Sequence, residues 1–209
     1  MEGLELNELL ECISPSIANL QLPDPDLRQF YMDEANRIYR VYGTIDDSLI
    51  QLVDMIERCN KEDKDIPVEE RRPIKVYIKS WGGNVVPMWT AINAIQMSRT
   101  PVWTINRAYA ESAGALLLVS GHKRFALKGT QAVFHKGSCC YQGEQSVVES
   151  TKKHYDKLDK KIEDFLFSHT KINPKTYNKK ASSDIYYDED ACLDNGVVDR
   201  VIESFDEII

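Results

Sequence analysis

The sequence predicts an α/β fold with a largely parallel sheet, and three observations support this prediction. Segments rich in β-branched and aromatic residues alternate with segments of helical spacing, which is the pattern of β-α-β units. The chain has 209 residues, which suits one domain, or one domain with an appendage. Apolar residues make up 43% and charged residues 28% of the chain, values that are typical of globular proteins and argue against wholesale disorder.

The charge balance and the hydropathy pattern argue against several classes of protein. Lys and Arg number 26 against 33 Asp and Glu, a net charge of −7, whereas a general nucleic-acid binder would carry a basic face. The longest apolar stretch, Ala113 to Val119, is far shorter than the roughly 18 residues of a membrane span. Residues 1–16 lack the basic and apolar regions of a signal peptide. We therefore expect a cytoplasmic protein that binds neither nucleic acid nor membrane.

The cysteines show no metal-ligand spacing. There are five, an odd number without a C-x-x-C pair, and neither His122 nor His135 extends Cys139 and Cys140 into a zinc pattern. We expect reduced thiols, as in a cytosolic protein, and no metal site.

The N-terminal residues 1–35 form a leader of mixed character that precedes a domain over 36–209. Four residues of this leader could form one apolar helical face: Leu4, Leu6, Leu9 and Leu10. Three prolines then interrupt any long helix: Pro15, Pro23 and Pro25. We expect the leader to be partly ordered, or to become ordered only on assembly.

The domain begins with a strand and a helix. Residues 37–43 are rich in β-branched and aromatic residues and end at Gly43, which predicts a strand. Asp46 or Asp47 can cap the following helix, in which apolar residues recur at helical spacing: Leu49, Leu52, Val53 and Ile56. Residues 60–73 are polar and contain proline, which predicts a surface loop.

Further strands and helices alternate after this loop. Residues 73–80 predict a strand with Val76 and Ile78 on one face, residues 86–97 predict a helix, and residues 100–106 predict a third strand. The remaining elements are a short apolar helix over 112–120 and a segment over 123–128 that leads into a strand over 131–136.

A long amphipathic helix is predicted over about 145–169. Its apolar residues are spaced three and four apart, like the seam of a helix that packs against another helix: Val148, Thr151, Tyr155, Leu158, Ile162 and Phe165. Such a seam fits either an ordinary helix on the core of its own domain or an arm that packs between subunits.

Ser112 is the first residue that could carry chemistry. It lies among small residues at a strand-to-helix junction, where a serine can serve simply as the N-cap of the helix. The functional alternative is a nucleophile, because free backbone N–H groups and the dipole at a helix N-terminus favour a developing negative charge. The G-x-S-x-G pattern of α/β-hydrolases is absent.

A serine nucleophile needs a base, and the base needs an orienting carboxylate. His135 is the candidate base, although a histidine within a strand is more often structural or exposed. His122 is a rival, but it follows the serine's own helix and is expected to point away from Ser112. Asp184 is the candidate carboxylate, and the aromatic residues that follow it could partly bury it.

The glycine pair Gly82-Gly83 directly follows a predicted strand. A plain turn accounts for most such pairs. Glycines at this place could also allow a close backbone approach that presents an N–H group to an oxyanion. Neither of the glycine-rich phosphate-binding patterns occurs, so a nucleotide-binding loop is not predicted.

Five collinear segments resemble the proteolytic subunit of the ATP-dependent Clp protease, from about Arg37 to Ile202. In order they are VYIKSWGGNVVPMWTAINAI, AYAESAGALLLVSGHKRFAL, AVFHKGSCCYQGE, the seam helix with the HT that ends it, and SSDIYYDEDACLDNGVVDRVI. One motif would be a weak signal, whereas five in matching order and spacing identify a divergent ClpP-like chain.

This resemblance implies a fold and an assembly. The family fold is a crotonase-like superhelix of repeated ββα units, with a handle made of a strand and a long helix, here over about 131–169. Its subunits form stacked seven-membered rings around a closed chamber. The resemblance also implies unfolded polypeptides as substrates, a Clp-type AAA+ unfoldase as a partner, and no cofactor for this subunit.

The same resemblance implies a role for each candidate residue. Ser112 would attack the peptide carbonyl, His135 would transfer the proton, and Asp184 would hold the imidazole. The backbone N–H groups of Gly83 and Ala113 would form the oxyanion hole. Further residues would contact the substrate: Gly82, Lys136 and Gly137.

Several residues depart from the family pattern, and other interpretations remain open. Trp81 replaces a proline, Ala113 a methionine, Ala108 a glycine and Glu111 a small residue, and the leader lacks the usual axial-loop sequence. We expect the charge of Glu111 beside Ser112 to repel acidic peptides. One alternative is a catalytically silent or regulatory ring subunit that co-assembles with an active paralogue. Another is an acyl-CoA hydratase of the same superfamily, against which the Ser/His/Asp set argues.

Overall fold

The computed structural model describes residues 24–137, 142–180 and 183–208. Internal contacts divide the chain into two compact units, Met1–Asn36 and Arg37–Ile209. The predicted apolar face of the leader, the Cys139-Cys140 pair and part of the predicted handle strand lie outside the described residues.

The described part of the first unit contains helix α2 (Pro25–Ala35). The Asp24 carboxylate caps this helix by accepting the N–H of Asp26 at 2.9 Å. Pro25 takes the first helical position, where its missing N–H leaves no helical bond unmade and its fixed φ already suits the helix. Pro25 therefore begins a helix, while the other two prolines of the leader lie outside the described residues.

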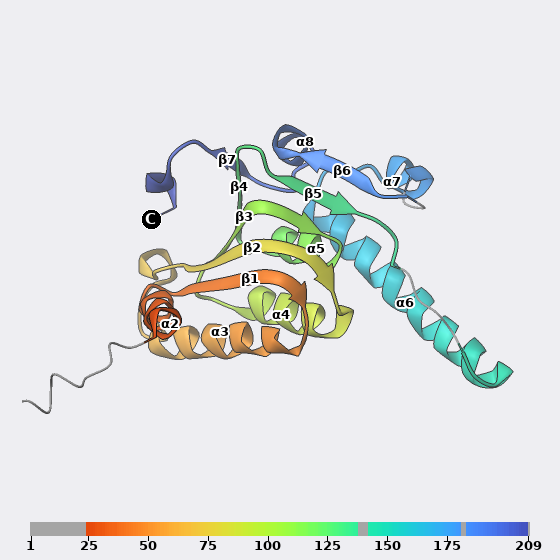
Figure 1. The fold of residues 1–209 in the computed structure, drawn as a ribbon, viewed down its shortest axis with the longest axis horizontal. Coiled ribbons are helices and arrows are strands. Elements are labelled where there is room, and N and C mark those ends of the chain that lie inside the picture. Colours follow the sequence, from red (N-terminus) through yellow and green to blue (C-terminus); the bar gives the residue numbers. More distant parts are fainter. Residues whose placement is uncertain (1–23, 138–141, 181–182, 209) are drawn as a thin grey trace, which may run out of the picture. The chain divides into compact units, whose positions relative to one another are not determined.

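The second unit alternates strands with helices, which confirms the predicted α/β class (Figure 1). Its strands are β1 (Ile38–Ile45), β2 (Ile74–Gly83), β3 (Val102–Glu111), β4 (Lys123–Leu127), β5 (Gln131–Phe134), β6 (Ile185–Asp188) and β7 (Arg200–Ile202). Its helices are α3 (Ile50–Glu62), α4 (Val85–Met97), α5 (Ala113–Val119), α6 (Gln145–His169), α7 (Pro174–Lys180) and α8 (Glu189–Asp194). Short 3-10 turns are found at Asp47–Leu49, Val68–Glu70 and Phe205–Glu207. The elements predicted between residues 37 and 169 are all present where the chain is described, but β2 and β3 run several residues further than expected.

The strands form one mostly parallel sheet in the order β1-β2-β3-β4-β7 (Figure 1). The central strand β3 divides between two partners, because residues 103–106 pair with β4 and residues 109–111 pair with β5. β6 then pairs with β5 as the antiparallel member of the sheet. The sheet therefore forks along β3, and one branch consists of β3, β5 and β6.

Helices α3, α4 and α5 lie together on one face of the sheet (Figure 1). Alternation along β2 explains this arrangement, because Ile74, Val76 and Ile78 are fully buried while the residues between them are more exposed. All residues of α5 are buried, so this short helix lies inside the core. Apolar side chains of α3 and α4 complete the same layer: Leu52, Met55, Ile56, Met88, Ile92 and Ile95.

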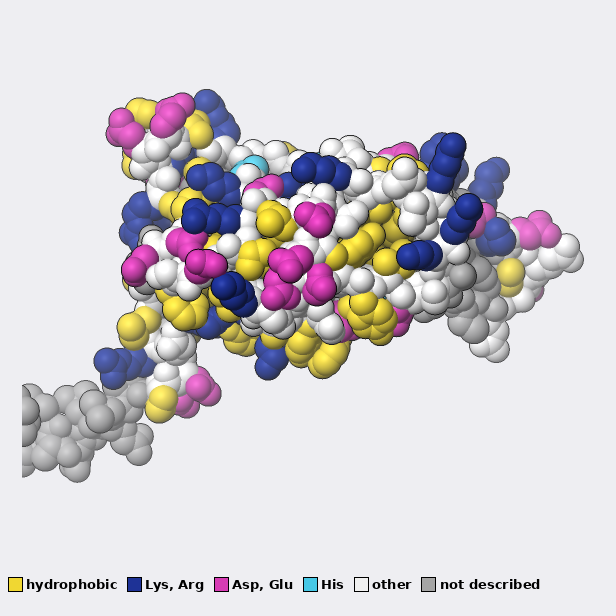
Figure 2. Space-filling view, turned by 90° about the horizontal axis from the view of Figure 1, so that it is seen from above, with side chains coloured by type: hydrophobic (Ala, Val, Ile, Leu, Met, Phe, Trp, Pro, Cys, Tyr) yellow, Lys and Arg dark blue, Asp and Glu magenta, His cyan; other side chains and the backbone are white. Residues whose placement is uncertain are grey.

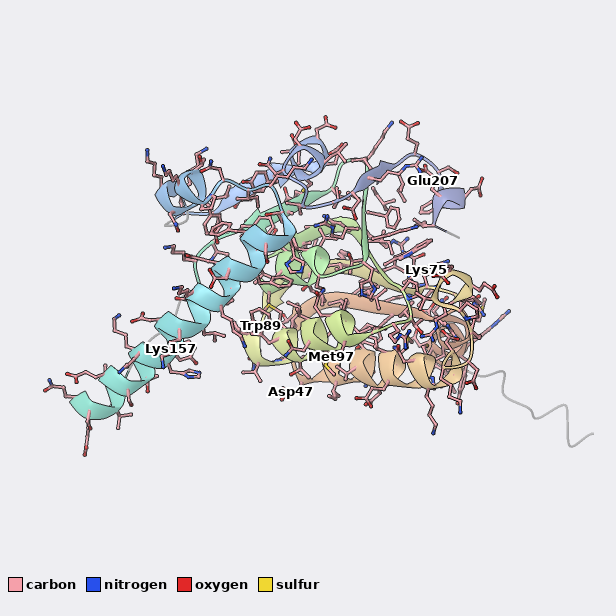
Figure 3. All side chains as sticks on the ribbon, turned by 180° about the vertical axis from the view of Figure 1, so that it is seen from behind. Asp47, Lys75, Trp89, Met97, Lys157 and Glu207 are labelled. Atoms are coloured by element: carbon pink, nitrogen blue, oxygen red, sulfur yellow. The ribbon has the colours of Figure 1, made fainter. Side chains whose placement is uncertain are left out.

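Helix α6 has 25 residues, and its second half packs on the core. Leu166 is buried, and Phe165 meets Trp89 of α4 edge-on with ring centroids 5.5 Å apart. Figure 3 labels Trp89 at the side of the domain along which α6 runs. The first half leads away from the sheet, and there Val147 is 52% and Tyr155 38% exposed (Figure 1). The helix thus packs on its own domain at one end, and at the other it exposes Val147 beside the seam and Tyr155 within it, while Val148, Thr151 and Leu158 are half-buried.

The surface over β6 and α8 is acidic with hydrophobic residues interspersed (Figure 2). Glu189 and Asp190 begin α8, while Tyr186 and Leu193 are exposed beside them. None of the helices in the described part of the chain combines the length and the apolar character that crossing a membrane requires.

A buried ion pair ties the start of β1 to the end of α3. Arg37 donates through its two Nη atoms to the two carboxylate oxygens of Asp63, at 2.6 and 2.8 Å, and the Thr100 hydroxyl donates to the same carboxylate at 2.9 Å. Asp63 is only 2% exposed, so water cannot replace these bonds. The Arg37 guanidinium holds the pKa of Asp63 below its usual range, although burial of the carboxyl acts in the opposite direction.

Replacing Asp63 with Asn should lower the free energy of unfolding by roughly 3 kcal/mol, because Arg37 would lose its buried counter-charge. The pKa of Asp63 is lower in the folded than in the unfolded chain. The stabilisation is therefore complete above the unfolded value, near about pH 4, and is lost as the pH falls through the folded value. Denaturant unfolding at several pH values should show the difference between the parent and Asp63→Asn shrinking in acid.

The exposed neighbour Asp65 provides the control for this measurement. Its side chain is 86% exposed, so Asp65→Asn should change the free energy of unfolding by less than about 0.5 kcal/mol. A difference between the parent and Asp63→Asn that stays constant down to the acid transition would contradict the role given to the ion pair.

Candidate active site

The end of β3 lies against β5. The two strands are parallel, and Glu111 at the end of β3 is paired with Val133. The N–H of Ser112 continues this contact by donating to the carbonyl of Val133 at 2.8 Å. Ser112 therefore lies beside the segment that leads to His135.

The next pair of strands brings His135 toward Asp184. β5 and β6 are antiparallel, and their last bridged pair is Phe134 with Ile185. Opposed residues of such a ladder have Cα atoms about 4.5–5.5 Å apart. His135 follows Phe134 and Asp184 precedes Ile185, so the two residues are adjacent to the same bridged pair of the ladder. The fork in the sheet thus gathers the three predicted residues from distant parts of the chain.

Ser112 has an unusual backbone conformation, with φ 53° and ψ −120°. Arg37 is the other non-glycine residue with positive φ in the described chain. Such a conformation costs about 1–3 kcal/mol and persists where the surroundings impose it, often at functional sites. The Ser112 side chain occupies the N-cap position of α5 but makes no capping hydrogen bond. The structure therefore favours the nucleophile over a simple helix cap.

Gly82 determines how closely β2 approaches Ser112. A Cβ added at Gly82 would lie 2.8 Å from Ser112 Cβ and 3.0 Å from the Ala113 nitrogen, so no side chain fits there. The Gly82 N–H donates to Ser80 Oγ at 3.1 Å, and this buried hydroxyl donates to the carbonyl of Gly43 at 2.6 Å. The glycine pair is therefore a close backbone approach and more than a plain turn.

The two predicted oxyanion donors come from different elements. Ala113 is the first residue of α5, directly after Ser112, and Gly83 is the last residue of β2. Gly83 has φ +148° and packs on the backbone of Ile45, where a Cβ would collide. A glycine is thus required at both positions of the pair.

A pocket opens beside Ser112, between α4, α5, β5 and the second half of α6. Its lining consists of Val85, Met88, Ser112, Ala113, Leu116, Phe134, His135, Lys136, Gly137, Asp159, Ile162, Glu163 and Tyr177. The structure therefore brings five of the predicted site residues to one pocket: Ser112, Ala113, His135, Lys136 and Gly137. Gly82 contacts Ser112 without lining the pocket, and Gly83 and Asp184 are not part of the lining either.

No hydrogen bond joins Ser112, His135 and Asp184 to one another, although all three belong to the described chain. Asp184 is exposed, whereas partial burial was expected, and it accepts a hydrogen bond from the Tyr186 hydroxyl at 3.3 Å. The negative charge of Asp184 raises the pKa of Tyr186, and Glu111 contributes to this effect. A hydroxyl, an imidazole and a carboxylate in this order can perform acyl transfer once the imidazole is aligned.

The rival histidine lies at the opposite end of β3. His122 Nδ1 accepts the N–H of Val102 at 2.9 Å, where β3 begins, while Ser112 follows its end. A strand of ten residues spans roughly 30 Å, so His122 cannot act on Ser112. Burial lowers the pKa of His122, as suits a neutral structural histidine.

Several residues around the site were not predicted from the sequence as part of it. Trp81 stacks on Tyr109 with ring centroids 3.8 Å apart, which joins the ends of β2 and β3. Tyr177 donates to the carbonyl of His135 at 3.4 Å, and burial raises its pKa to about 12. Asp159 enters the pocket from α6. Trp81 stands next to the glycine pair and could have been found there, whereas Tyr177 and Asp159 come from distant helices without any local signal.

The described residues contain no group of three or more His, Cys, Asp or Glu side chains that could hold a metal ion. The free cysteines Cys59 and Cys192 are buried away from this pocket. Burial raises the pKa of both thiols, to about 12 for Cys192, so both are inert packing groups.

Gly82→Ala should displace Ser112 and slow its reaction with a fluorophosphonate at least about 100-fold, because small misplacements of reacting groups have effects of that size. Gly129→Ala is the matched control, since Gly129 also has a positive φ but has nothing within 4 Å of an added Cβ. Both variants should lose about 1 kcal/mol of stability from the positive φ, and Gly82→Ala should lose more because its Cβ would collide with the backbone after β3. Equal labelling rates in the two folded variants would contradict the role of the close approach.

Comparison with known protein families agrees with this arrangement. The family model described as Clp protease matches residues 36–205, which is most of the chain and includes Ser112, His135 and Asp184. The match, together with the parallel sheet, confirms the predicted ClpP-like α/β fold. The chain is therefore a member of the Clp protease family.

Proposed function

We propose that this chain is a serine endopeptidase, the proteolytic subunit of a self-compartmentalising Clp-type protease that works in the cytoplasm. Family membership supports a peptidase. One observation carries the serine mechanism: Ser112 is held in a strained conformation at the start of α5, does not cap that helix, and shares a pocket with His135. A serine that only capped the helix would have its hydroxyl bound to a backbone N–H.

The reaction begins with a peptide in the pocket. Ser112 Oγ attacks the carbonyl carbon of the scissile bond while His135 takes the hydroxyl proton. The carbonyl oxygen becomes an oxyanion, for which the N–H groups of Gly83 and Ala113 are the donors. His135 then gives its proton to the leaving amine, and the acyl group stays on Ser112 as an ester. His135 next takes a proton from a water molecule that attacks this ester, and it returns the proton to Ser112 Oγ as the acid product leaves. Asp184 orients the imidazole in both stages.

We place the bound peptide between the end of β2 and the segment after β5. Gly82, Lys136 and Gly137 would offer backbone groups to an extended peptide, which gives affinity without a sequence requirement. Such recognition suits unfolded polypeptides, and a Clp-type AAA+ unfoldase would supply them.

A second candidate function is a catalytically silent or regulatory ring subunit that co-assembles with an active paralogue. The observation that favours it is the geometry of Asp184, which is bonded to Tyr186 and not to His135. The two candidates differ in whether Asp184 turns to His135 when a peptide binds. Catalytic hydrogen bonds are often long or absent before binding, so the endopeptidase remains the better-supported function.

A fluorophosphonate probe and an unfolded casein substrate distinguish these functions. The parent should be labelled and should cleave the casein, and Ser112→Ala should lose both activities. His135→Ala and Asp184→Asn should lower the rate of cleavage by at least about 10³-fold. Ser150→Ala, on the exposed side of α6, is the control and should behave as the parent. An assembled parent that is neither labelled nor active would show the silent subunit.

We further propose that copies of this chain assemble into stacked rings through the first half of α6. The support is apolar surface in this half, where Val147 is 52% and Tyr155 38% exposed, because exposed apolar surface often marks an interaction site. Another copy of the chain could cover this surface, because the described part of the domain core packs against the other half of the helix. The stacked heptamer is the arrangement that the family resemblance implies.

Val148→Glu should shift the protein to smaller species in sedimentation velocity, because a carboxylate would lie in the proposed contact between copies. Ser146→Glu introduces the same charge two residues away at an exposed position off the seam, and it should leave the assembly unchanged. Equal sedimentation of the two variants would exclude this half of α6 from the assembly.

A further inference from the structure

The pocket beside Ser112 has apolar walls and an acidic side. Val85, Met88 and Leu116 come from α4 and α5, and they form walls that suit the methylene groups of a long side chain. Helix α6 contributes two carboxylates one turn apart, Asp159 and Glu163. The pocket therefore differs from a purely hydrophobic one.

The two carboxylates are not equivalent. Glu163 is paired with Lys136, whose Nζ lies 3.3 Å from Glu163 Oε1. Asp159 is half-buried, and it has neither a hydrogen bond nor an ion pair with any described residue. Lys136 is the cation whose charge lowers the pKa of Asp159, and its ammonium group is already paired with Glu163.

The surroundings of Asp159 make its charge unfavourable in the single chain. Burial raises the pKa of Asp159, and the negative charges of Asp156 and Glu163 raise it further, while Lys136 offsets this only in part. A half-buried carboxylate of this kind gains from any cation that reaches it, because the ion pair would form in a partly water-excluded site. The cation must come from outside the described chain.

We propose that this pocket binds a basic side chain of the peptide substrate, with Asp159 as its counter-charge. The aliphatic part of a lysine would lie along the apolar walls, and its ammonium group would meet Asp159. This inference rests on the proposed function, because it assigns the pocket to a substrate residue next to the bond that Ser112 attacks. It makes Asp159 a specificity-determining residue without a part in the chemistry.

Peptide binding to the full-length Ser112→Ala protein tests this inference without requiring catalysis. Fluorescent peptides would carry lysine or its uncharged isostere norleucine at either position beside the intended scissile bond, and anisotropy would give their affinities. The lysine peptide should bind roughly tenfold more tightly, the size of a charge-assisted contact in a partly dry site. Asp159→Asn, added to Ser112→Ala, should remove this preference.

Asp164→Asn is the matched control, because it removes the same charge from the same helix at an exposed residue that does not line the pocket. The lysine preference should survive in this variant, which separates a local ion pair from general attraction to an acidic protein. Equal affinities for the two peptides, or a preference that persists in Asp159→Asn, would overturn the inference. Neither result affects the proposed function, which fails instead if the parent is not labelled by the fluorophosphonate.

Discussion

The site depends on the contact between Gly82 and Ser112. The end of β2 can approach the turn after β3 only because Gly82 has no side chain, and the Ser80 hydroxyl holds that end to β1 through Gly43. Retreat of β2 would free Ser112 to leave its strained φ, and its hydroxyl could then turn to cap α5 as serines ordinarily do. The stacking of Trp81 on Tyr109 closes the same junction from another side. A proline at position 81 could make no such stack, so the tryptophan gives this chain an additional clamp.

The fork in β3 is the second requirement of the site. β4 pairs only with the first part of β3, and Asn106 lies where the pairing passes to β5. The buried Asn106 amide donates to the carbonyl of Gln131 at 2.8 Å, and its oxygen accepts the N–H of Ala108 at 3.2 Å. These bonds satisfy backbone groups that would otherwise lack partners at the fork. Because β5 can therefore join β3 near its end, His135 reaches the level of Ser112.

The sequence predicts the elements before residue 170 because their signals are local. Alternation, helical spacing and glycine boundaries place each strand and helix within a few residues. The extension of β2 and β3 was missed because Gly82, Gly83 and the small residues before Ser112 have weak strand preferences, and only pairing with neighbouring strands overrides them. The fork could not be predicted either, since it depends on which strand β3 meets at each position.

Some of the candidate residues could likewise be predicted from local patterns, whereas their surroundings depend on the three-dimensional fold. Ser112, His135 and the glycine pair stand at junctions between elements, where a short pattern identifies them. The surroundings of Asp184 depend on Tyr186, whose hydroxyl competes for its carboxylate, and no pattern reveals the outcome of that competition. The acidic side of the pocket depends on where a helix far along the chain docks. Its location could be predicted only from the three-dimensional structure.

The two sides of the pocket differ in how freely they can change. Gly82 and Ser112 are fixed by contacts that leave no room for another side chain, so changes there disturb the core. Asp159 is half-buried but makes no hydrogen bond or ion pair with a described residue, so replacing it breaks no polar contact of the fold. Under the proposed substrate binding, the charge of the pocket could therefore change without loss of a polar contact. The residue proposed for specificity then lies on α6, apart from the strand ends and the helix start that carry the residues proposed for the chemistry.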